Sequence, residues 1–259
     1  MDLGLSGKKA IVCASSRGLG KAIAMELAKE GCVMAINGRD PKSLSLAASE
    51  IESATGKKPD IVVGDLSTQS GRADLLSAIP EPDILITNNG GPPPGAIGEW
   101  THENWLDALE ANMLSAIHLI EEVIAGMQRR KFGRILNITS AMVKSPKLPM
   151  ALSTTARAGL TAFTRALAPD VIKHNVTVNN LLPEKIETDR LHQLINETSS
   201  RANISPGQAR EKFLKTIPAR RFGKPEEFAA ICIFLCSERA AYITGQNISV
   251  DGGSYRGLI

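Results

Sequence analysis

Short apolar runs alternate with longer segments of helical periodicity along most of the chain. The apolar runs have the length of buried strands and fall at residues 9–13, 32–37, 61–65, 83–87, 134–139, 175–182 and 247–250. Segments with a helical repeat lie between them at residues 21–31, 41–55, 69–79, 104–130, 158–163 and 225–236. Strands that alternate with helices are joined by right-handed crossovers, which make the sheet parallel and place helices on both of its faces. The pattern therefore predicts a single α/β domain over residues 1–259, with a doubly wound, seven-stranded parallel sheet.

One region departs from this alternation. Residues 184–220 are polar and irregular, with short helical patterns around 187–196 and 206–215. No shift in composition marks a linker, and no internal repeat exists beyond the alternation of strand and helix. We therefore expect an insertion within the one domain.

Composition and charge exclude several classes of partner. Hydrophobic residues make up 43% of the 259 residues and charged residues 22%, which is ordinary for a globular protein. A net charge of +3, with no basic run longer than residues 129–131, gives too little bias for binding nucleic acid or a membrane surface. No signal peptide is apparent, and no apolar run approaches the ~20 residues of a spanning helix. We expect a cytoplasmic protein with neither nucleic acid nor a membrane as partner.

The four cysteines do not form a recognisable ligand set. Cys232 and Cys236 stand four residues apart in an apolar helical segment, so they share one helix face. A metal pair is conceivable there, but no His or further Cys accompanies them nearby. Two buried apolar thiols are the favoured interpretation, and no metal site is predicted.

A glycine-rich turn follows the first apolar run. Its sequence, Ala14-Ser15-Ser16-Arg17-Gly18-Leu19-Gly20, leads directly into the first helical segment. Glycines in such a turn let backbone N–H groups approach a pyrophosphate at the helix N-terminus. Two glycines alone are weak evidence, but their position after the first strand indicates a dinucleotide site.

The end of the second apolar run indicates which dinucleotide binds. An acidic residue there would accept a hydrogen bond from a ribose 2′-hydroxyl, but this chain has Asn37-Gly38-Arg39. Arg39 can make a bidentate contact to a 2′-phosphate, and Arg17 could lie on the same side. We therefore predict NADP(H) in preference to NAD(H), the alternative being two solvated arginines. Asp40 is expected to cap the next helix rather than face the ribose.

The segment from Ser140 to Arg157 begins where the apolar run at 134–139 ends. In open α/β sheets, ligands bind beyond the carboxyl ends of the strands, so side chains here are candidates for chemistry. The Gly- and Pro-rich loop at residues 90–95 follows another strand end. It is either a simple turn or one wall of a pocket.

In this order, the motifs resemble those of the short-chain dehydrogenase/reductase family, and in particular those of its 3-oxoacyl-acyl-carrier-protein reductases. The matching segments extend over nearly the whole chain: residues 13–20, Asp65, residues 87–90, Asn112, residues 183–188, 221–227, 242–245 and 250–253. The resemblance implies a single-domain Rossmann fold with a nicotinamide cofactor. The residues at the family's cofactor-binding positions are Ala14, Ser15, Ser16, Arg17, Gly18, Leu19, Gly20, Asn37, Gly38, Arg39, Asp65, Leu66, Asn88, Asn89, Gly90, Arg157, Pro183, Glu184, Ile186 and Thr188.

The catalytic positions match the family only in part. The family places a Ser, a Tyr 13 residues later and a Lys four residues further on, and these positions hold Ser140, Ser153 and Arg157. An aliphatic hydroxyl titrates far above the pKa of about 10 of a Tyr, so Ser153 is a poor general acid. Arg157 stays protonated, with a pKa above about 12, and can hold a ribose but not relay a proton. The resemblance leaves Ser140 to polarise a carbonyl and Asn112 to hold a water or a backbone kink.

Two smaller departures lie in the cofactor motifs. Ala14 adds a methyl where the family has a Gly near the pyrophosphate. Glu184 replaces a Gly near the nicotinamide, where its charge would favour the oxidised ring unless Lys185 or Arg157 neutralises it.

Two functions are compatible with these residues. The first is an NADP(H)-dependent oxidoreductase that acts on a small carbonyl or alcohol substrate, with Ser140, Asn112, Ser153, Arg157 and Lys185 as its catalytic set. A relocated proton donor is then required, and the candidates are Lys144, Lys147, Glu184 and Lys185. The second is a homologue that binds NADP(H) as a sensor or partner subunit with little or no turnover. Residues 187–216 resemble the family's substrate lid, which favours the first.

The resemblance also implies a homodimer or homotetramer. Family members pack the helices that here span about 104–130 and 153–168, and Leu114, Ile117, His118 and Glu121 fall on that face. His118 is expected to serve this interface or the surface rather than catalysis.

Overall fold

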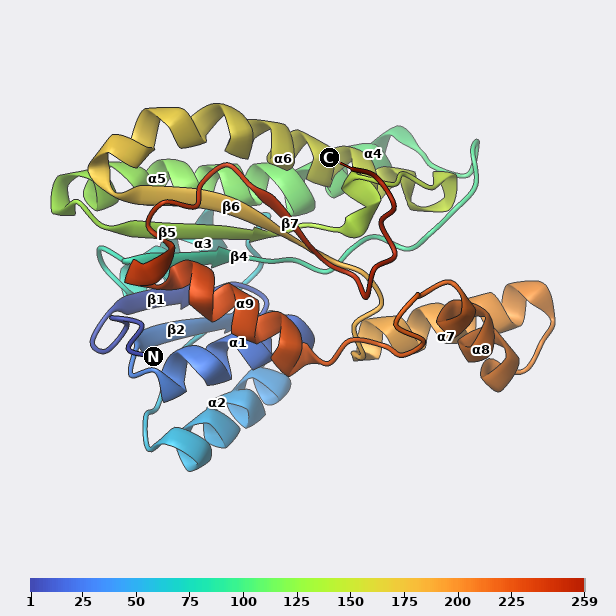
Figure 1. Cartoon of the computed structure of the whole chain (residues 1–259), viewed down its shortest axis with the longest axis horizontal. Helices are drawn as coiled ribbons and strands as arrows, with labels where there is room; N and C mark the ends of the chain where they lie inside the picture. The colour runs from blue at the N-terminus through green and yellow to red at the C-terminus, as the bar shows by residue number, and fades with distance from the viewer. Residues whose placement is uncertain (259) are drawn as a thin grey trace.

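Seven parallel strands form the centre of the molecule in the computed structural model, which describes residues 1–258 (Figure 1). They are β1 (Lys9–Val12), β2 (Val33–Gly38), β3 (Asp60–Val63), β4 (Ile84–Thr87), β5 (Gly133–Ile138), β6 (Val176–Pro183) and β7 (Asn247–Val250), in the order β3-β2-β1-β4-β5-β6-β7. The strand order reverses between β1 and β4, which is the point where such sheets bind ligands. The predicted fold class is therefore confirmed.

Alternate residues of the strands supply two separate hydrophobic cores. In β1, Ala10 and Val12 pack against α1 (Gly18–Lys29), α2 (Pro41–Thr55) and α9 (Pro225–Cys236). Ile11 and Cys13 point to the other face and pack with residues of α3 (Gln69–Ala78), α5 (Ser115–Arg130) and α6 (Ala151–Val171). Figure 1 shows these two helix layers on opposite sides of the sheet. Burial on both faces explains why the strands are continuously apolar rather than alternating.

The prediction of a single helix at residues 104–130 is wrong in one respect. The segment forms α4 (His102–Leu109) and α5, with a π-helical turn at Glu110–Leu114 between them. Such a turn adds one residue within an otherwise continuous helix, and the sequence keeps a helical repeat on each side of it, so the prediction ran straight through it. The turn contains Asn112, whose side chain is buried.

The remaining helices complete the chain. Among residues 1–258, four short 3₁₀ turns lie at Ala141–Val143, Leu148–Met150, Ile172–His174 and Glu238–Ala240.

Several local predictions can be compared with the structure. As expected, Asp40 caps α2, since its carboxylate accepts the backbone N–H of Ser43 at 2.9 Å. Cys232 and Cys236 are both buried in α9, as predicted for apolar thiols. No helix among residues 1–258 is long and apolar enough to cross a membrane.

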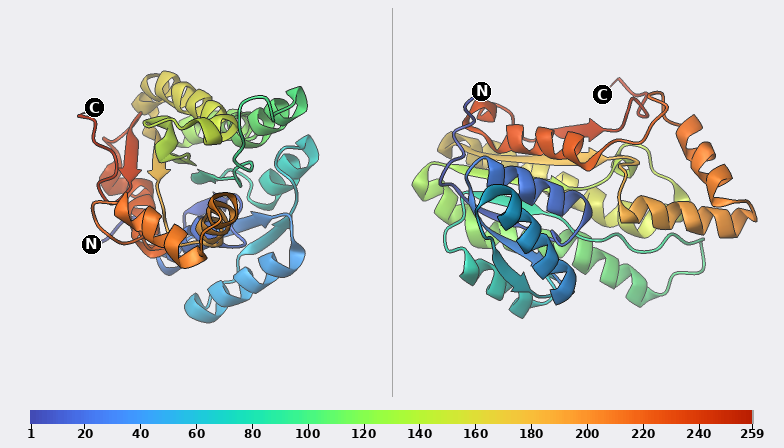
Figure 2. Two further views of the ribbon diagram at one scale, coloured as in Figure 1. Left: turned by 90° about the vertical axis from the view of Figure 1, so that its right-hand side faces the viewer. Right: turned by 90° about the horizontal axis from the view of Figure 1, so that it is seen from below.

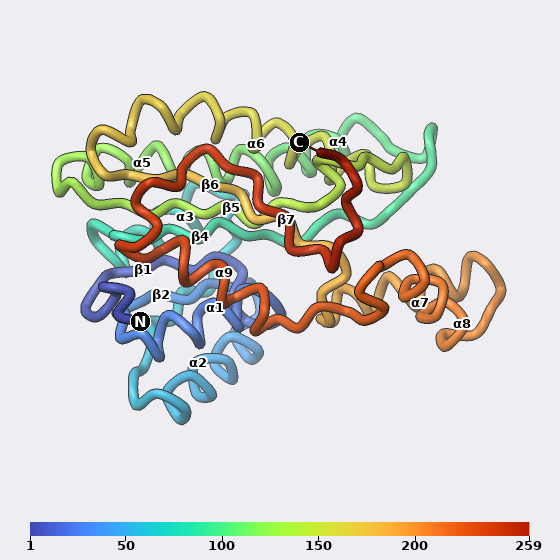
Figure 3. The backbone as a smooth tube through the Cα atoms, in the orientation of Figure 1, coloured from blue at the N-terminus to red at the C-terminus, as the bar shows by residue number. Residues whose placement is uncertain are grey.

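The predicted insertion forms a helical hairpin of α7 (Asp189–Ala202) and α8 (Pro206–Lys215). It projects from the carboxyl edge of the sheet (Figures 2 and 3). The hairpin has a small apolar core of its own, made by Leu191, Ile195, Ala209, Ile217 and Phe222. Helix α7 continues well past the predicted end at residue 196. Its polar outer face hid this length, because few apolar positions mark the helical repeat there.

Candidate active site

A large cleft runs along the carboxyl edge of the sheet, below the hairpin of α7 and α8. Its volume is about 1040 Å³, which is ample for a dinucleotide together with a small substrate. Most of the predicted site residues line it: Ala14, Ser16, Arg17, Gly18, Leu19, Asn37, Gly38, Arg39, Asp65, Leu66, Asn88, Asn89, Gly90, Ser140, Ser153, Arg157, Pro183, Glu184, Lys185, Ile186 and Thr188. Ser15, Gly20 and Asn112 do not.

The glycine-rich turn at residues 14–20 has a tight backbone that its own residues determine. Ala14 and Gly18 have left-handed backbones, with φ of 46° and 57°. An added Cβ at Gly20 would collide with the Ala14 carbonyl oxygen, so Gly20 is needed for the turn itself. Ser15 is buried and donates its hydroxyl to the Val12 carbonyl at 2.8 Å. The methyl of Ala14 is thus accommodated, at the expense of a backbone conformation that non-glycine residues rarely adopt.

The end of β2 presents Arg39 to the cleft. Its guanidinium lies 3.8 Å from a carboxylate oxygen of Asp65, and its side chain is 75% exposed. The Asp65 carboxylate accepts the backbone N–H of Ser67 at 3.0 Å, and this bond, aided by Arg39, lowers the pKa of Asp65. Asn37 is buried instead and donates to backbone carbonyls of Val62 and Gly64, so it joins strands. Arg39, in contrast, lines the cleft with an exposed guanidinium, whose geometry suits a phosphate.

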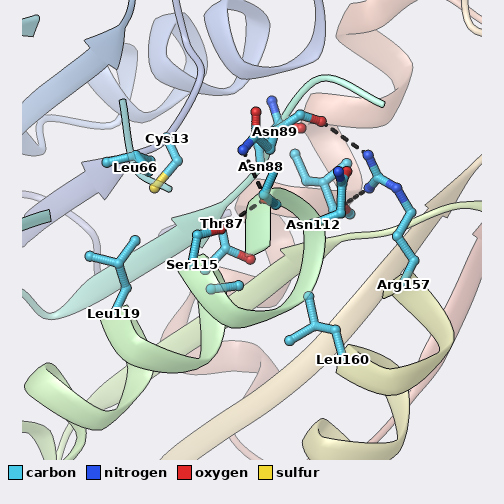
Figure 4. A pocket seen from close by; sticks show the side chains of 13 residues that line it. Cys13, Leu66, Thr87, Asn88, Asn89, Asn112, Ser115, Leu119, Arg157 and Leu160 are labelled. Carbon is cyan, nitrogen blue, oxygen red and sulfur yellow. Dashed lines mark hydrogen bonds between the residues drawn. The ribbon is translucent and has the colours of Figure 1, made fainter. Parts of the chain in front are cut away.

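Arg157 is buried and extensively hydrogen-bonded within the predicted catalytic segment. It is only 7% exposed, and Nη1 donates to the carbonyls of Ile138 and Thr139 at 2.6 and 2.8 Å. Nη2 donates to the Asn89 carbonyl at 3.0 Å, and Nε donates to Ser153 Oγ at 3.1 Å. The guanidinium thereby fastens α6 to the ends of β4 and β5 (Figure 4). One of its five N–H groups has none of these partners.

The charge of Arg157 has no carboxylate within ion-pair distance among residues 1–258. Burial, and after it the positive charge of Arg190, lower the pKa of Arg157 to about 10. The group nevertheless stays protonated at neutral pH. The site thus holds a positive charge without a carboxylate partner, in contact with the Ser153 hydroxyl.

Ser140 and Ser153 are the two hydroxyls that line the catalytic end of the cleft. Ser140 Oγ accepts the backbone N–H of Met142 at 3.1 Å, which leaves its own hydrogen available for a ligand. Ser153 Oγ accepts from Arg157 Nε, so its hydrogen is available in the same way. Both hydroxyls can therefore donate to an oxygen in the cleft.

Asn112 lies behind the cleft, at a small internal cavity (Figure 4). Its side-chain oxygen is buried and has no hydrogen-bond partner. Arg157 lines both this cavity and the cleft. The π-helical turn is tied to the cleft wall because Asn89 Nδ2 donates to the Ala111 carbonyl at 2.8 Å. Asn112 is thus close to the site without lining the main cleft.

The four proton-donor candidates are in different settings. Lys185 and Glu184 both line the cleft and form an ion pair of 2.9 Å, with side chains only 14% and 11% exposed. Lys185 also donates to Thr216 Oγ1 at 2.7 Å. The charge of Glu184 is therefore neutralised by Lys185. Lys147 lines the cleft but is exposed, and the Lys144 ammonium lies 5.0 Å from the centre of the Tyr255 ring, outside the cleft lining.

Helix α7 adds two arginines that sequence reasoning missed. Arg190 Nη2 donates to the Pro92 carbonyl and Arg201 Nη2 to the Pro94 carbonyl, both at 2.9 Å. Gly90, Gly91 and Pro94 line the cleft, so the loop at 90–95 forms one wall of the pocket. The arginines are eleven residues apart, about three helical turns, and this spacing could have placed them on one face.

His118 lies outside both cavities, and its Nδ1 is 3.0 Å from a carboxylate oxygen of Glu121 on the exposed side of α5. This position is consistent with a surface or interface residue, as expected from the sequence.

The chain is similar to known proteins over nearly its whole length. Residues 13–255 match a family model described as enoyl-(acyl carrier protein) reductase. The chain is 33% identical to the NADPH-dependent reductase BacG of Bacillus subtilis, over 98% of this chain and 100% of that protein. It is 32% identical to the 3-oxoacyl-[acyl-carrier-protein] reductase FabG of Aquifex aeolicus, again over 98% and 100%.

A solved structure gives the same picture. The L-sorbose reductase of Gluconobacter frateurii, in complex with NADPH and L-sorbose, superimposes with a TM-score of 0.93 and 32% identity. All of this chain and all of that chain are covered.

Proposed function

Because this chain belongs to the short-chain dehydrogenase/reductase family, we propose that it is an NADP(H)-dependent reductase of a small carbonyl compound with an altered proton-transfer centre. The observation that carries the proposal is the convergence of Ser140, Ser153 and Arg157 on one cleft. Hydroxyl donors and a fixed cation at that place can stabilise negative charge on a substrate oxygen.

The cofactor is NADP(H), in agreement with the sequence prediction. Arg39 would bind the 2′-phosphate, and the turn containing Gly18 would approach the pyrophosphate. Arg157 would use its remaining N–H on the nicotinamide ribose. The bound cofactor supplies a hydride. The left-handed turn at Gly18 and the 75% exposed side chain of Arg39 both line the cleft and fit this group.

The serines would receive the charge that hydride transfer places on the carbonyl oxygen. Ser140 and Ser153 both donate their hydroxyls to that oxygen. Arg157, bonded to Ser153 Oγ, makes this hydroxyl a better donor because its positive charge stabilises electron density on the oxygen. Neither serine is acidic enough to be the final source of the proton at neutral pH.

Lys185 is the best-placed source of that proton among the four candidates. Its ammonium lines the cleft, is largely shielded from solvent and is held by Glu184 and Thr216. A lysine in such a setting can donate a proton through one water and recover it from solvent. Helices α7 and α8 would act as a lid that limits access of water while this occurs.

A second function is favoured by the hydrogen bonds of Arg157. Four of its donors are occupied by the protein, so the residue also serves as a structural clamp. A homologue that binds NADP(H) as a sensor or partner subunit would need this clamp and no proton donor. Association through the exposed face of α5, as a homodimer or homotetramer, is compatible with both functions.

Cofactor titration beside a turnover screen tests the proposal. We expect NADPH to bind at least about tenfold more tightly than NADH, and Arg39→Ser to remove most of that difference. We also expect NADPH oxidation with at least one ketoacyl, keto-sugar, quinone or dicarbonyl compound. Lys185→Met should abolish it, whereas Lys144→Met, outside the cleft lining, should not. Tight NADPH binding without any turnover would favour the second function, and binding of neither dinucleotide would exclude both.

A further inference from the structure

The substrate end of the cleft carries an excess of positive charge. Arg157, Arg190, Arg201 and Lys147 all line the cleft, and none is within 4.0 Å of a carboxylate among the described residues. Three acids line this part of the cleft. Glu184 is neutralised by Lys185, Asp189 lies 4.0 Å from Arg17, and Glu197 has no cation within 4.0 Å among the described residues, so the cations outnumber the acids that could neutralise them.

Two of these cations converge beside the serine hydroxyls. A Cβ built onto Gly91 would be 3.6 Å from Ser153 Oγ and 4.0 Å from Arg190 Nη2, so both groups flank the same point of the cleft wall. Arg157 Nε is bonded to that same Ser153 Oγ. Arg190 is near enough for its charge to act on Arg157. Two like charges so placed repel each other, and an anion between them would relieve that repulsion.

Arg190 is the guanidinium group with donors left for a ligand. It has one bond to the protein, from Nη2 to the Pro92 carbonyl, and its other N–H groups have no partner among residues 1–258. Arg157 has a single N–H beyond its four bonds, which the proposed function assigns to the nicotinamide ribose, so Arg157 acts on an anion through its charge. Arginine is suited to bidentate binding of a planar carboxylate.

The surrounding wall is largely apolar. Met142, Pro149, Met150, Leu194 and Phe213 line the same cleft, from the segment after Ser140 and from the hairpin of α7 and α8. A ligand that fills this space therefore needs one anionic group at the arginines and a hydrophobic remainder.

From this arrangement we infer that the substrate is an oxo acid, whose carboxylate binds to Arg190 near the charge of Arg157 while its apolar part lies against Met142, Met150 and Leu194. This substrate class rests on the proposed reductase function. Ser140 and Ser153 would then meet the carbonyl oxygen next to the anchored carboxylate. Arg190 binds the anion, and Arg157 attracts it by charge and positions Ser153.

The test compares two probes that differ only in charge. The protein saturated with NADP⁺ is titrated with 3-phenylpropanoate and with 3-phenylpropanamide, which have the same apolar group. We expect the carboxylate to bind at least about tenfold more tightly than the amide, a difference of about 1.4 kcal/mol. Arg190→Met should remove this preference and leave NADP⁺ affinity unchanged within about twofold.

Arg201→Met is the matched control, because Arg201 also fastens α7 to a proline carbonyl. If Arg201→Met removes the preference as fully as Arg190→Met, the lid contact is responsible and the inference is wrong. The inference is also wrong if the amide binds as tightly as the carboxylate. It is wrong as well if Arg190→Met lowers the affinity for NADP⁺ tenfold or more, because Arg190 then serves the cofactor. Because the probes are not turned over, an inactive protein that prefers the carboxylate would contradict the reductase function alone. Turnover of neutral ketones without any carboxylate preference would contradict the oxo-acid inference alone.

Discussion

Arg134 and Arg157 lie at opposite ends of β5, and within residues 1–258 both are buried cations with no carboxylate at ion-pair distance. Arg134, at the amino end, is 1% exposed and donates to the carbonyls of Ser237, Gly133 and Asn175. It also lies 4.4 Å from the centre of the Phe132 ring. Arg157, at the carboxyl end, likewise donates to backbone carbonyls. Burial lowers the pKa of both.

The difference between them lies in what surrounds the guanidinium. Arg134 is enclosed by the end of α9, the start of β6 and an aromatic ring, so its charge is met by carbonyl dipoles and a π face. Arg157 opens onto the cleft and has a second cation, Arg190, nearby. A buried cation satisfied by carbonyls is thus an ordinary structural element. An open cleft and an unrelieved like charge are the features that indicate a binding function at Arg157.

We expect the largest effect from replacing Arg134, the structural arginine of the two. Arg134→Met leaves the Ser237 carbonyl without its donor and removes the contact with Phe132, so the free energy of unfolding should fall by about 3 kcal/mol. Urea unfolding measures this. NADPH affinity should stay the same, because Arg134 is remote from the cleft, and an equally large loss of affinity would show that the two arginines do not differ in function.

Arg157→Met should disturb both stability and activity. With the best substrate of the turnover screen, kcat/KM should fall about 100-fold, or about 2.7 kcal/mol, because the oxygen of the substrate loses the cation behind Ser153. Steady-state kinetics with NADPH would measure it. Arg157→Lys keeps the charge and should recover part of the loss. Equal kcat/KM in the Met and Lys variants would assign Arg157 a structural role like that of Arg134.

Restoring the Tyr and Lys that the family places at positions 153 and 157 should raise activity rather than lower it. Ser153→Tyr with Arg157→Lys supplies a phenol whose pKa a neighbouring lysine can lower. Carbonyl reduction should then rise at least about tenfold, which is below the roughly 100-fold or more that a well-positioned general acid typically contributes. Ser153→Phe with Arg157→Lys has the same ring without the hydroxyl. If that control shows the same gain, the effect is not proton transfer.

The smallest effect concerns an exposed arginine that does have a carboxylate partner. Arg221 donates to both oxygens of Glu227 at 2.7 and 2.6 Å and lowers the pKa of Glu227 to about 2 from 4.5. The pair therefore stabilises the fold fully above pH 4.5, and this contribution is lost as the pH falls toward 2. Glu227→Gln should lower Tm slightly at pH 7, by no more than about 2 °C, and not at all near pH 2. Thermal unfolding at both values checks this, and a Tm decrease that persists at pH 2 would point to packing rather than charge.

Local patterns were sufficient for much of the fold. The strands needed only continuous apolar runs, and the glycine-rich turn needed only its position between a strand and a helix. Asp40 followed by Pro41 predicted a helix start that the structure contains. The π-helical turn around Asn112 was missed, because the helical repeat continues on each side of it and the turn itself packs against α6. The full length of α7 escaped detection for a related reason, since only one narrow face of it is apolar.

The sequence by itself determined the order of the elements, the cofactor motifs and the replacement of the expected Tyr and Lys by Ser153 and Arg157, because each is carried by neighbouring residues. Only the tertiary structure decided what Arg157 does. Its partners come from the ends of β4 and β5, 18 to 68 residues away, and its neighbouring cation comes from α7. A charge acts on whatever lies within a few ångströms of it in space, and no local pattern records that distance.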